Sequence, residues 1–171
     1  MSDDASKLQI LLARLVIVLM VGLVAVGVVL HGVSGPVFVR IWQNILARPF
    51  GPMTFRFILQ PVMATLAALR DGVRDARLGR APYLWTILSD PEKRGGRLRE
   101  GLIATARVLL LGLVMDVTYQ LLVFDEFHPA EAVIVAVLLA FMPYLLLRGV
   151  IARIARRRMA GAGAMPDGFQ S

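Results

Sequence analysis

Three long apolar stretches dominate the sequence, and each carries at most two charged residues. An α-helix rises about 1.5 Å per residue and the hydrocarbon core of a bilayer is about 30 Å thick, so about 20 apolar residues span it. The pattern therefore predicts membrane-spanning helices over residues 8–33, 101–124 and 130–152. We expect the 171 residues to form a single membrane domain, because little chain is left for a water-soluble one.

A further apolar segment, residues 53–69, is ambiguous. It contains Arg56, Gln60 and Pro61, which raise the free energy of inserting it into a membrane. We predict an all-α integral membrane bundle with four transmembrane helices, in which this segment is the second, because its apolar residues would otherwise form an exposed patch. The alternative is three transmembrane helices plus a re-entrant or interfacial segment.

Residues 37–47 have the amphipathic pattern of a helix that lies in the membrane interface. Apolar pairs recur at helical spacing, and Arg40 and Gln43 lie on or near the opposite face. The ring of Trp42 also favours the interface. The alternative is a helix outside the bilayer that packs on the rest of the protein.

Residues 70–100 form a basic connector, with eight Lys or Arg against five Asp or Glu, and we expect it on the cytoplasmic side. Ser89 or Asp90 begins a new helix there, and Gly95 and Gly96 are expected to break it soon afterwards. Four acidic residues lie among the arginines: Asp71, Asp75, Asp90 and Glu92. Acidic residues in this setting are more typical of exposed ion pairs than of a metal site.

The carboxyl end is strongly basic, which predicts that it lies in the cytoplasm. Four arginines of this end are expected to contact anionic lipid head groups: Arg153, Arg156, Arg157 and Arg158. Nucleic acid is not an expected partner, since no binding motif with interleaved aromatic residues accompanies the arginines. Residues 159–171 are rich in Gly and Ala, and we expect a disordered tail there.

Composition agrees with a membrane protein and argues against several kinds of site. Apolar residues make up 57% of the chain, above the roughly 45 to 50% of soluble domains, and the mean hydropathy is +0.69. The chain has no cysteine, and its two histidines, His31 and His128, are far apart in sequence. Disulfides, thiolate metal ligands and zinc are therefore not expected, and no cofactor motif occurs. Only two of the 19 basic residues are lysine, a bias that favours a bacterial source and so the inner membrane.

Asp116 is the residue whose position most favours chemistry, because it lies well inside a predicted span. A carboxylate at that depth needs a partner or stays protonated. Tyr119 and Gln120 follow one helical turn later, and in the four-span arrangement Gln60 reaches about the same depth while Arg56 lies a turn nearer the surface. We predict one polar cluster of these five residues. It is either an interhelical clasp or a proton-coupled or ion-binding site, and the clasp is favoured because no second acidic residue is expected at this depth.

The last predicted span carries small residues at a spacing of four, extended by a tyrosine: Ala132, Ala136, Ala140 and Tyr144. Small residues at this spacing let helices approach closely. We predict that this packing seam joins spans of one chain or joins two protomers. Pro143 is expected to weaken the helix near its inner end.

Five distinctive phrases occur between Arg48 and Arg153 or just before: ARPFGPMTFRFILQP, RDGVRDARLGRAPYLW, LREGL, MDVTYQ and PAEAVIVAVLLAFMPYLLLRG. Through them the chain resembles a family of small, uncharacterised bacterial multi-span membrane proteins. The resemblance implies a membrane location but brings no activity, substrate or functional residue. The first span lies ahead of these phrases and looks like an addition to the common core.

These patterns favour a non-enzymatic role, as a structural or accessory subunit that packs with a larger partner or with itself. The second possibility is a small transporter or channel with Asp116 at the centre of its pathway. A membrane enzyme is disfavoured, because neither a histidine nor paired carboxylates gather at the cytoplasmic interface.

Overall fold

The computed structural model describes residues 2–32, 35–47, 54–123 and 127–162, and every regular element in these residues is a helix. The elements are α1 (Ser2–His31), α2 (Gly35–Ala47), α3 (Arg56–Arg77), α4 (Tyr83–Ser89), α5 (Pro91–Val123), α6 (Pro129–Ala136), η2 (Val137–Phe141) and α7 (Met142–Ala162). The predicted all-helical class is confirmed. Three stretches are long and apolar enough to cross a membrane, Lys7–His31, Pro91–Val123 and Pro129–Gly161, and the predicted second span is not among them.

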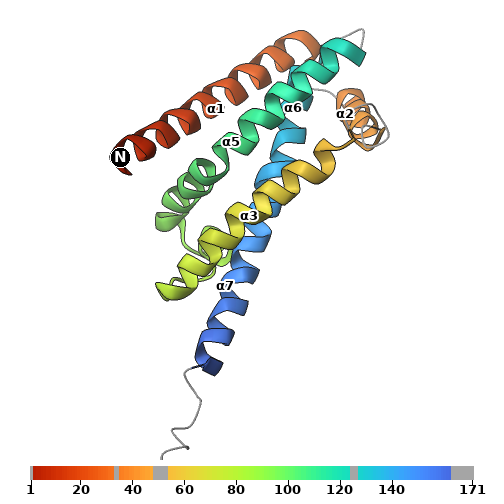
Figure 1. Ribbon diagram of the computed structural model, residues 1–171. Coiled ribbons are helices and arrows are strands. Elements are labelled where there is room, and N and C mark those ends of the chain that lie inside the picture. The colour runs from red at the N-terminus through yellow and green to blue at the C-terminus, as the bar shows by residue number, and fades with distance from the viewer. Residues whose placement is uncertain (1, 33–34, 48–53, 124–126, 163–171) are drawn as a thin grey trace, which may run out of the picture.

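The helices form an elongated bundle in which α1 packs against α5 and α6, while α3 lies along α7 (Figure 1). α1 and α5 run in the same direction, because their first halves line one cavity together and His31, at the end of α1, reaches Phe127, just beyond α5. α3 and α6–η2–α7 run the opposite way. The bundle therefore has a histidine end, marked by His31 and His128, and an arginine end, where α3 ends, α4 lies and α7 continues.

α3 is amphipathic rather than apolar all round. Its buried positions recur every four residues: Arg56, Gln60, Ala64, Ala68, Gly72 and Ala76. The opposite side exposes large apolar side chains such as Ile58, Leu66 and Leu69. Charges at both ends of α3 lower its mean hydropathy, which is why it does not qualify as an apolar membrane helix by composition.

The last helix contains one wide turn. Pro143 has no N–H to donate and its ring crowds the carbonyl group one turn earlier. η2 is a π-helical turn that ends two residues before this proline, and the backbone N–H of Met142 donates to the Val137 carbonyl, five residues back. The predicted weak point at Pro143 therefore takes the form of a π turn inside a helix that continues to Ala162.

Two expectations about helix ends were wrong. Gly95 and Gly96 do not break the helix, since α5 runs without interruption from Pro91 to Val123. Each glycine in a helix interior costs about 1 kcal/mol relative to alanine, and the packing of the long apolar part of α5 exceeds that cost. α7 extends through residues 159–162, which were assigned to a disordered tail. The rest of that tail, residues 163–171, lies outside the described residues.

α2 corresponds to the predicted amphipathic segment and begins two residues earlier, at Gly35. Ile41 is buried and Trp42 is 58% exposed, so the helix has one face toward the protein and one away from it. α2 touches α6 near the histidine end of the bundle (Figure 1). Its location in a membrane interface stays a prediction.

Candidate functional site

The predicted polar cluster lies between α3 and α5. Arg56, the first residue of α3, forms an ion pair with Asp116 of α5. Gln120, one turn further along α5, donates a hydrogen bond from Nε2 to Oδ2 of Asp116 at 2.7 Å. The guanidinium carbon of Arg56 also lies 5.5 Å from the centre of the Tyr119 ring, a cation–π contact. The structure thus brings together four of the five residues that the sequence grouped.

Gln60, the fifth residue, is fully buried in the same interface but contacts a different part of α5. Both polar atoms of its amide lie 3.3 Å from the position that a Cβ on Gly112 would occupy, one turn before Asp116. Among the described residues, neither amide atom has a hydrogen-bond partner, and the same is true of Nη1 of Arg56. An unsatisfied amide in a dry interior is costly and attracts a water or another polar group.

Burial determines what this cluster can do. Asp116 is 0% and Arg56 1% exposed, so the carboxylate is neutralised by a guanidinium inside the protein rather than by water. The larger cavities that the described residues line do not reach Asp116. Because removing one member of such a pair leaves the other as an uncompensated buried charge, the pair holds α3 and α5 in register. The geometry favours an interhelical clasp.

The cluster continues to the histidine end of the bundle. Oε1 of Gln120 accepts a hydrogen bond from the backbone N–H of His128 at 2.8 Å. The His128 ring stacks on that of His31, with 4.6 Å between centroids and 14° between planes. His31 in turn bonds through Nε2 to the Phe127 carbonyl at 2.9 Å. The sequence analysis did not pair these histidines because they are far apart in the chain. A signal was present, since one histidine ends the first predicted span and the other precedes the last, which predicts that both lie on the same side of the membrane.

A small cavity of about 160 Å³ lies beside the two histidines, with Arg40 and Glu131 also in its wall. In the described part of the chain, no group of three or more His, Asp or Glu side chains is arranged to hold a metal ion. Asp125 and Glu126, the acidic residues of the adjoining loop, lie outside the described residues. We assign no chemistry to this end of the bundle beyond the contacts given above.

A second buried network, which the sequence analysis missed, lies at the arginine end and joins α3, α5 and α7. Arg148 of α7 makes a bidentate pair with Asp75 of α3, with Nε at 2.8 Å and Nη2 at 3.1 Å from the carboxylate oxygens. Nη2 also reaches Glu100 of α5 at 3.1 Å. Asp75 is 1% and Arg148 3% exposed. The expectation of exposed ion pairs was therefore wrong for Asp75, because the carboxylate faces the interior of the bundle.

Two tyrosines complete this network. Nη1 of Arg148 donates to the Tyr144 hydroxyl at 2.7 Å, and that hydroxyl donates to Asp71 at 2.7 Å. The guanidinium lies 4.1 Å from the centre of the Tyr83 ring. Tyr83 is fully buried in α4, and its hydroxyl donates to the Arg97 carbonyl. Burial raises the pKa of Tyr83 to about 12, so its hydroxyl remains a donor at all physiological pH values.

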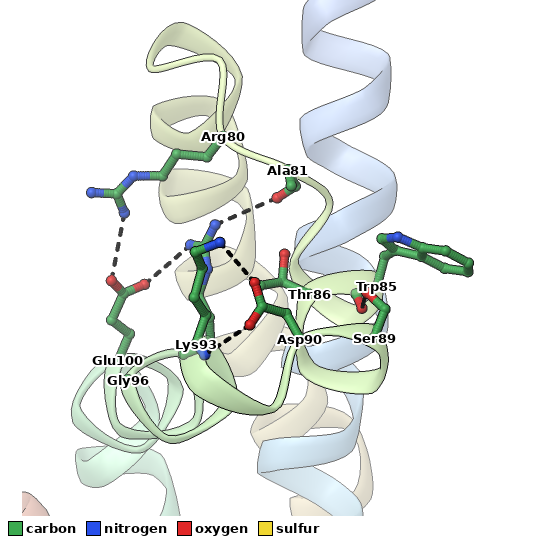
Figure 2. A pocket seen from close by; sticks show the side chains of 10 residues that line it. Arg80, Ala81, Trp85, Thr86, Ser89, Asp90, Lys93, Gly96 and Glu100 are labelled. Atoms are coloured by element: carbon green, nitrogen blue, oxygen red, sulfur yellow. Dashed lines mark hydrogen bonds and ion pairs between the residues drawn. The ribbon is translucent and has the colours of Figure 1, made fainter.

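Two cavities adjoin the network and share Arg80 and Glu100 in their walls, which form an ion pair at 3.5 Å. The larger, of about 650 Å³, opens between α4 and the start of α5. Figure 2 shows Lys93 turned toward Asp90, while the Trp85 ring is directed away from these two residues. Lys93 holds the pKa of Asp90 below its usual value through hydrogen bonds from its side chain and backbone N–H. The cations that line this cavity are therefore already paired.

The smaller cavity, of about 370 Å³, lies between the start of α1, the end of α3 and α5. Its wall combines apolar residues, including Ala67, Ile103 and Ala104, with charged ones. Arg70 and Arg74 of α3 belong to this wall, and neither forms an ion pair with a described residue. The cavity has an apolar side and a side with unpaired positive charge.

The predicted packing seam is entirely internal. Ala132, Ala136, Ala140 and Tyr144 are each 0% exposed. Ala136 and Ala140 pack in a cluster with Leu109 and other apolar residues of α5, and Tyr144 packs with Ala64 and Ala68 of α3. Of the two uses predicted for the seam, the structure employs the one within a single chain, and no surface of the seam is left for a partner.

The predicted head-group arginines lie on the last turns of α7. Arg153, Arg157 and Arg158 are exposed, whereas Arg156 is half-buried and donates from Nε to the Ala152 carbonyl at 3.4 Å. They are separate from the Asp75–Arg148 network, about one and a half to three turns further along the helix. Their contact with lipid stays a prediction.

Comparisons of this chain with protein-family models, with curated proteins and with solved structures found no match. The resemblance to a family of small bacterial membrane proteins therefore stays a prediction, and the chain's own residues are the basis for inferring its function.

Proposed function

We propose that this protein is a small integral membrane protein with a structural role, either on its own or as an accessory subunit, and that it is not an enzyme. The observation that carries the proposal is the arrangement of its buried charges. Asp116 is held by Arg56 and Gln120, and Asp75 by Arg148, so each of these two buried carboxylates joins two helices. Polar contacts of this kind specify helix partners within a membrane.

We further propose that α3 crosses the membrane, giving four spans with both termini on one side. The parallel course of α1 and α5 supports this, since the chain must return across the bilayer between them, and α3 runs in the required direction. Its 22 residues correspond to about 33 Å of helix, of which the part from Arg56 to Leu69, ahead of the basic end, covers about 21 Å. Arg56 is neutralised by Asp116, and Arg70 lies near the opposite end, where its side chain can reach the interface.

The concentration of arginine at one end of the bundle supports a cytoplasmic location for that end and for the carboxyl terminus. The low share of lysine among the basic residues supports a bacterial inner membrane. A topology experiment is straightforward because the natural chain has no cysteine. In Gln43→Cys and Ser89→Cys variants, a membrane-impermeant maleimide added to intact cells should label only the first. Labelling of both or of neither from the outside would contradict the four-span arrangement.

A small transporter or channel is the second candidate, and one observation favours it. The amide of Gln60 and Nη1 of Arg56 are buried without partners among the described residues, one turn apart on α3. Unsatisfied groups at such depth are found where water or an ion passes. Asp116 would then be the charged residue of the pathway.

Asp116→Asn separates the two candidates. Because the change leaves Arg56 buried without a counter-charge, we expect it to lower the free energy of unfolding by about 3 kcal/mol. Thr118→Val is the matched control, since Thr118 is exposed on the same helix and bonds only to its own backbone at Val114. Proteoliposomes of the wild-type protein should show no more proton or cation flux than empty ones. Flux that Asp116→Asn abolishes while the fold stays intact would refute the structural role.

A further inference from the structure

The cavity between α1, α3 and α5 at the arginine end has the properties of a binding site for an amphiphile. At about 370 Å³ it falls in the size range of ligand sites, about 300 to 1,000 Å³. Ala67, Ile103 and Ala104 form an apolar wall, and Arg70 and Arg74 add charge on the α3 side. We propose that it binds one anionic phospholipid, with the phosphate at these two arginines and the glycerol and first acyl carbons against the apolar wall.

The charge balance of the cavity wall supports an anionic ligand. Arg80 and Arg148 are occupied by Asp75 and Glu100, and Asp71 accepts a hydrogen bond from Tyr144. Arg70 and Arg74 are left as exposed cations, four residues apart and so on one face of α3. Two guanidinium groups so placed suit the oxygens of one phosphodiester.

The position of the cavity supports a lipid rather than a soluble phosphate. On α3, Leu66 and Leu69 are 62% and 52% exposed, and the arginines follow directly after them. This change from exposed apolar to exposed basic residues marks the level of lipid head groups. Trp85 of α4 is 64% exposed at the same end of the bundle, as is usual for an interfacial aromatic residue.

The inference deepens the proposed function, because it depends on the chain being embedded in a membrane with its arginine end at the bilayer surface. It differs from a general attraction of basic residues to anionic lipid. The exposed arginines of α7 offer charge without a cavity, and thus provide a direct comparison within the same molecule.

The test is a titration of the full chain in detergent micelles with phosphatidylglycerol or phosphatidylcholine, with bound lipid counted by native mass spectrometry. We expect phosphatidylglycerol to bind in a one-to-one ratio and more tightly than phosphatidylcholine. Replacing both cavity arginines, as Arg70→Gln with Arg74→Gln, should weaken binding about 30-fold, since two arginines near a head group together contribute about one and a half powers of ten. The matched control, Arg153→Gln with Arg157→Gln, removes the same charge and should change binding less than about 3-fold.

A third variant tests the apolar side of the cavity. Ala67→Leu fills space without changing charge, and we expect it to weaken phosphatidylglycerol binding about 10-fold, the equivalent of two methylene contacts. Inorganic phosphate at millimolar concentration should not displace the lipid. Circular dichroism should show that each variant remains helical, because all five substitutions in the three variants are at half-buried or exposed positions.

Three results would overturn the inference. The first is an equal loss of phosphatidylglycerol binding in the two double variants, and the second is equal binding of phosphatidylglycerol and phosphatidylcholine. The third is displacement of the lipid by inorganic phosphate together with no effect of Ala67→Leu on binding. The first indicates a diffuse electrostatic attraction and the last a soluble phosphate ligand. A wild-type chain that fractionates with the soluble proteins of the cell would instead refute the proposed membrane role itself. The two failures are therefore distinguishable.

Discussion

Arg148 is the side chain whose removal is expected to destabilise the bundle most. It contacts Asp75, Glu100 and Tyr144 by hydrogen bonds and the Tyr83 ring by a cation–π contact, and so links α7 to three other helices. In Arg148→Met, Asp75 stays buried, and the nearest remaining cations, Arg97 and Arg80, are 3.5 and 3.6 Å away. These distances are too long for good hydrogen bonds.

Breaking a buried ion pair by removing one partner costs about 3 to 5 kcal/mol, and we expect Arg148→Met to lie in this range. The double variant Arg148→Met with Asp75→Leu leaves no uncompensated buried carboxylate. We therefore expect it to be more stable than the single variant by about 1 kcal/mol or more. Arg153→Met removes an exposed arginine from the same helix and should change stability by no more than about 0.5 kcal/mol.

The assay is unfolding of the purified protein in mild detergent by added dodecyl sulfate, followed by far-ultraviolet circular dichroism. Asp75→Leu alone completes the double-mutant cycle with the wild type, Arg148→Met and the double variant, and the cycle gives the coupling free energy between Arg148 and Asp75. The reasoning is refuted if Arg148→Met costs no more than Arg153→Met. It is also refuted if the double variant is less stable than the single one, because the penalty would then not come from the stranded carboxylate.

Two further predictions use the same assay. Gly72→Ala should destabilise the bundle by about 1 to 3 kcal/mol, because the new Cβ would lie 2.9 Å from both the Arg148 carbonyl oxygen and a methyl group of Ile151. The control is Gly22→Ala, whose Cβ would meet nothing within 4 Å. A Gly72 variant as stable as that control would contradict the close approach of α3 and α7. Burial raises the pKa of Tyr83 from 10.0 in the unfolded chain to about 12 in the folded one. The buried neutral hydroxyl therefore stabilises the fold fully below pH 10, and this contribution is lost as the pH rises toward 12. Stability should fall less steeply over this interval in Tyr83→Phe, and identical slopes for variant and wild type would show that the hydroxyl is not buried.

The three apolar helices could be predicted from sequence because hydrocarbon imposes a simple requirement on length and polarity. α3 could not be assigned by that criterion, since its charges lie at its ends and its buried face is partly polar. The position of α3 beside α7 follows instead from the matching four-residue spacing of buried residues on both helices, which becomes informative only when the two are known to pack together.

The Asp116 cluster could be predicted from the sequence because a carboxylate within an apolar stretch is conspicuous. The role of Arg148 could not be predicted in this way, since Arg148 stands near the start of a run of arginines and looks like one more basic residue at the end of a span. Its spacing of four from Tyr144 was the available signal, because it places Arg148 on the buried side of the helix. The stacking of His31 on His128 depends on the parallel and antiparallel courses of the helices, which sequence separation alone does not give.

The π turn before Pro143 has a consequence for the geometry of the whole last helix. Residues 132, 136, 140, 144, 148 and 152 are all buried, although a step of four residues advances about 40° around a regular α-helix. Five steps would accumulate about 200° and carry the last positions to the lipid side. The additional residue in the wide turn rotates the following residues back by about 100°. The net rotation from residue 132 to residue 152 is then about 100°, which is within the width of one packing face of a helix. Shortening that turn by one residue would rotate the Arg148 guanidinium away from Asp75 and onto the outer surface of the bundle.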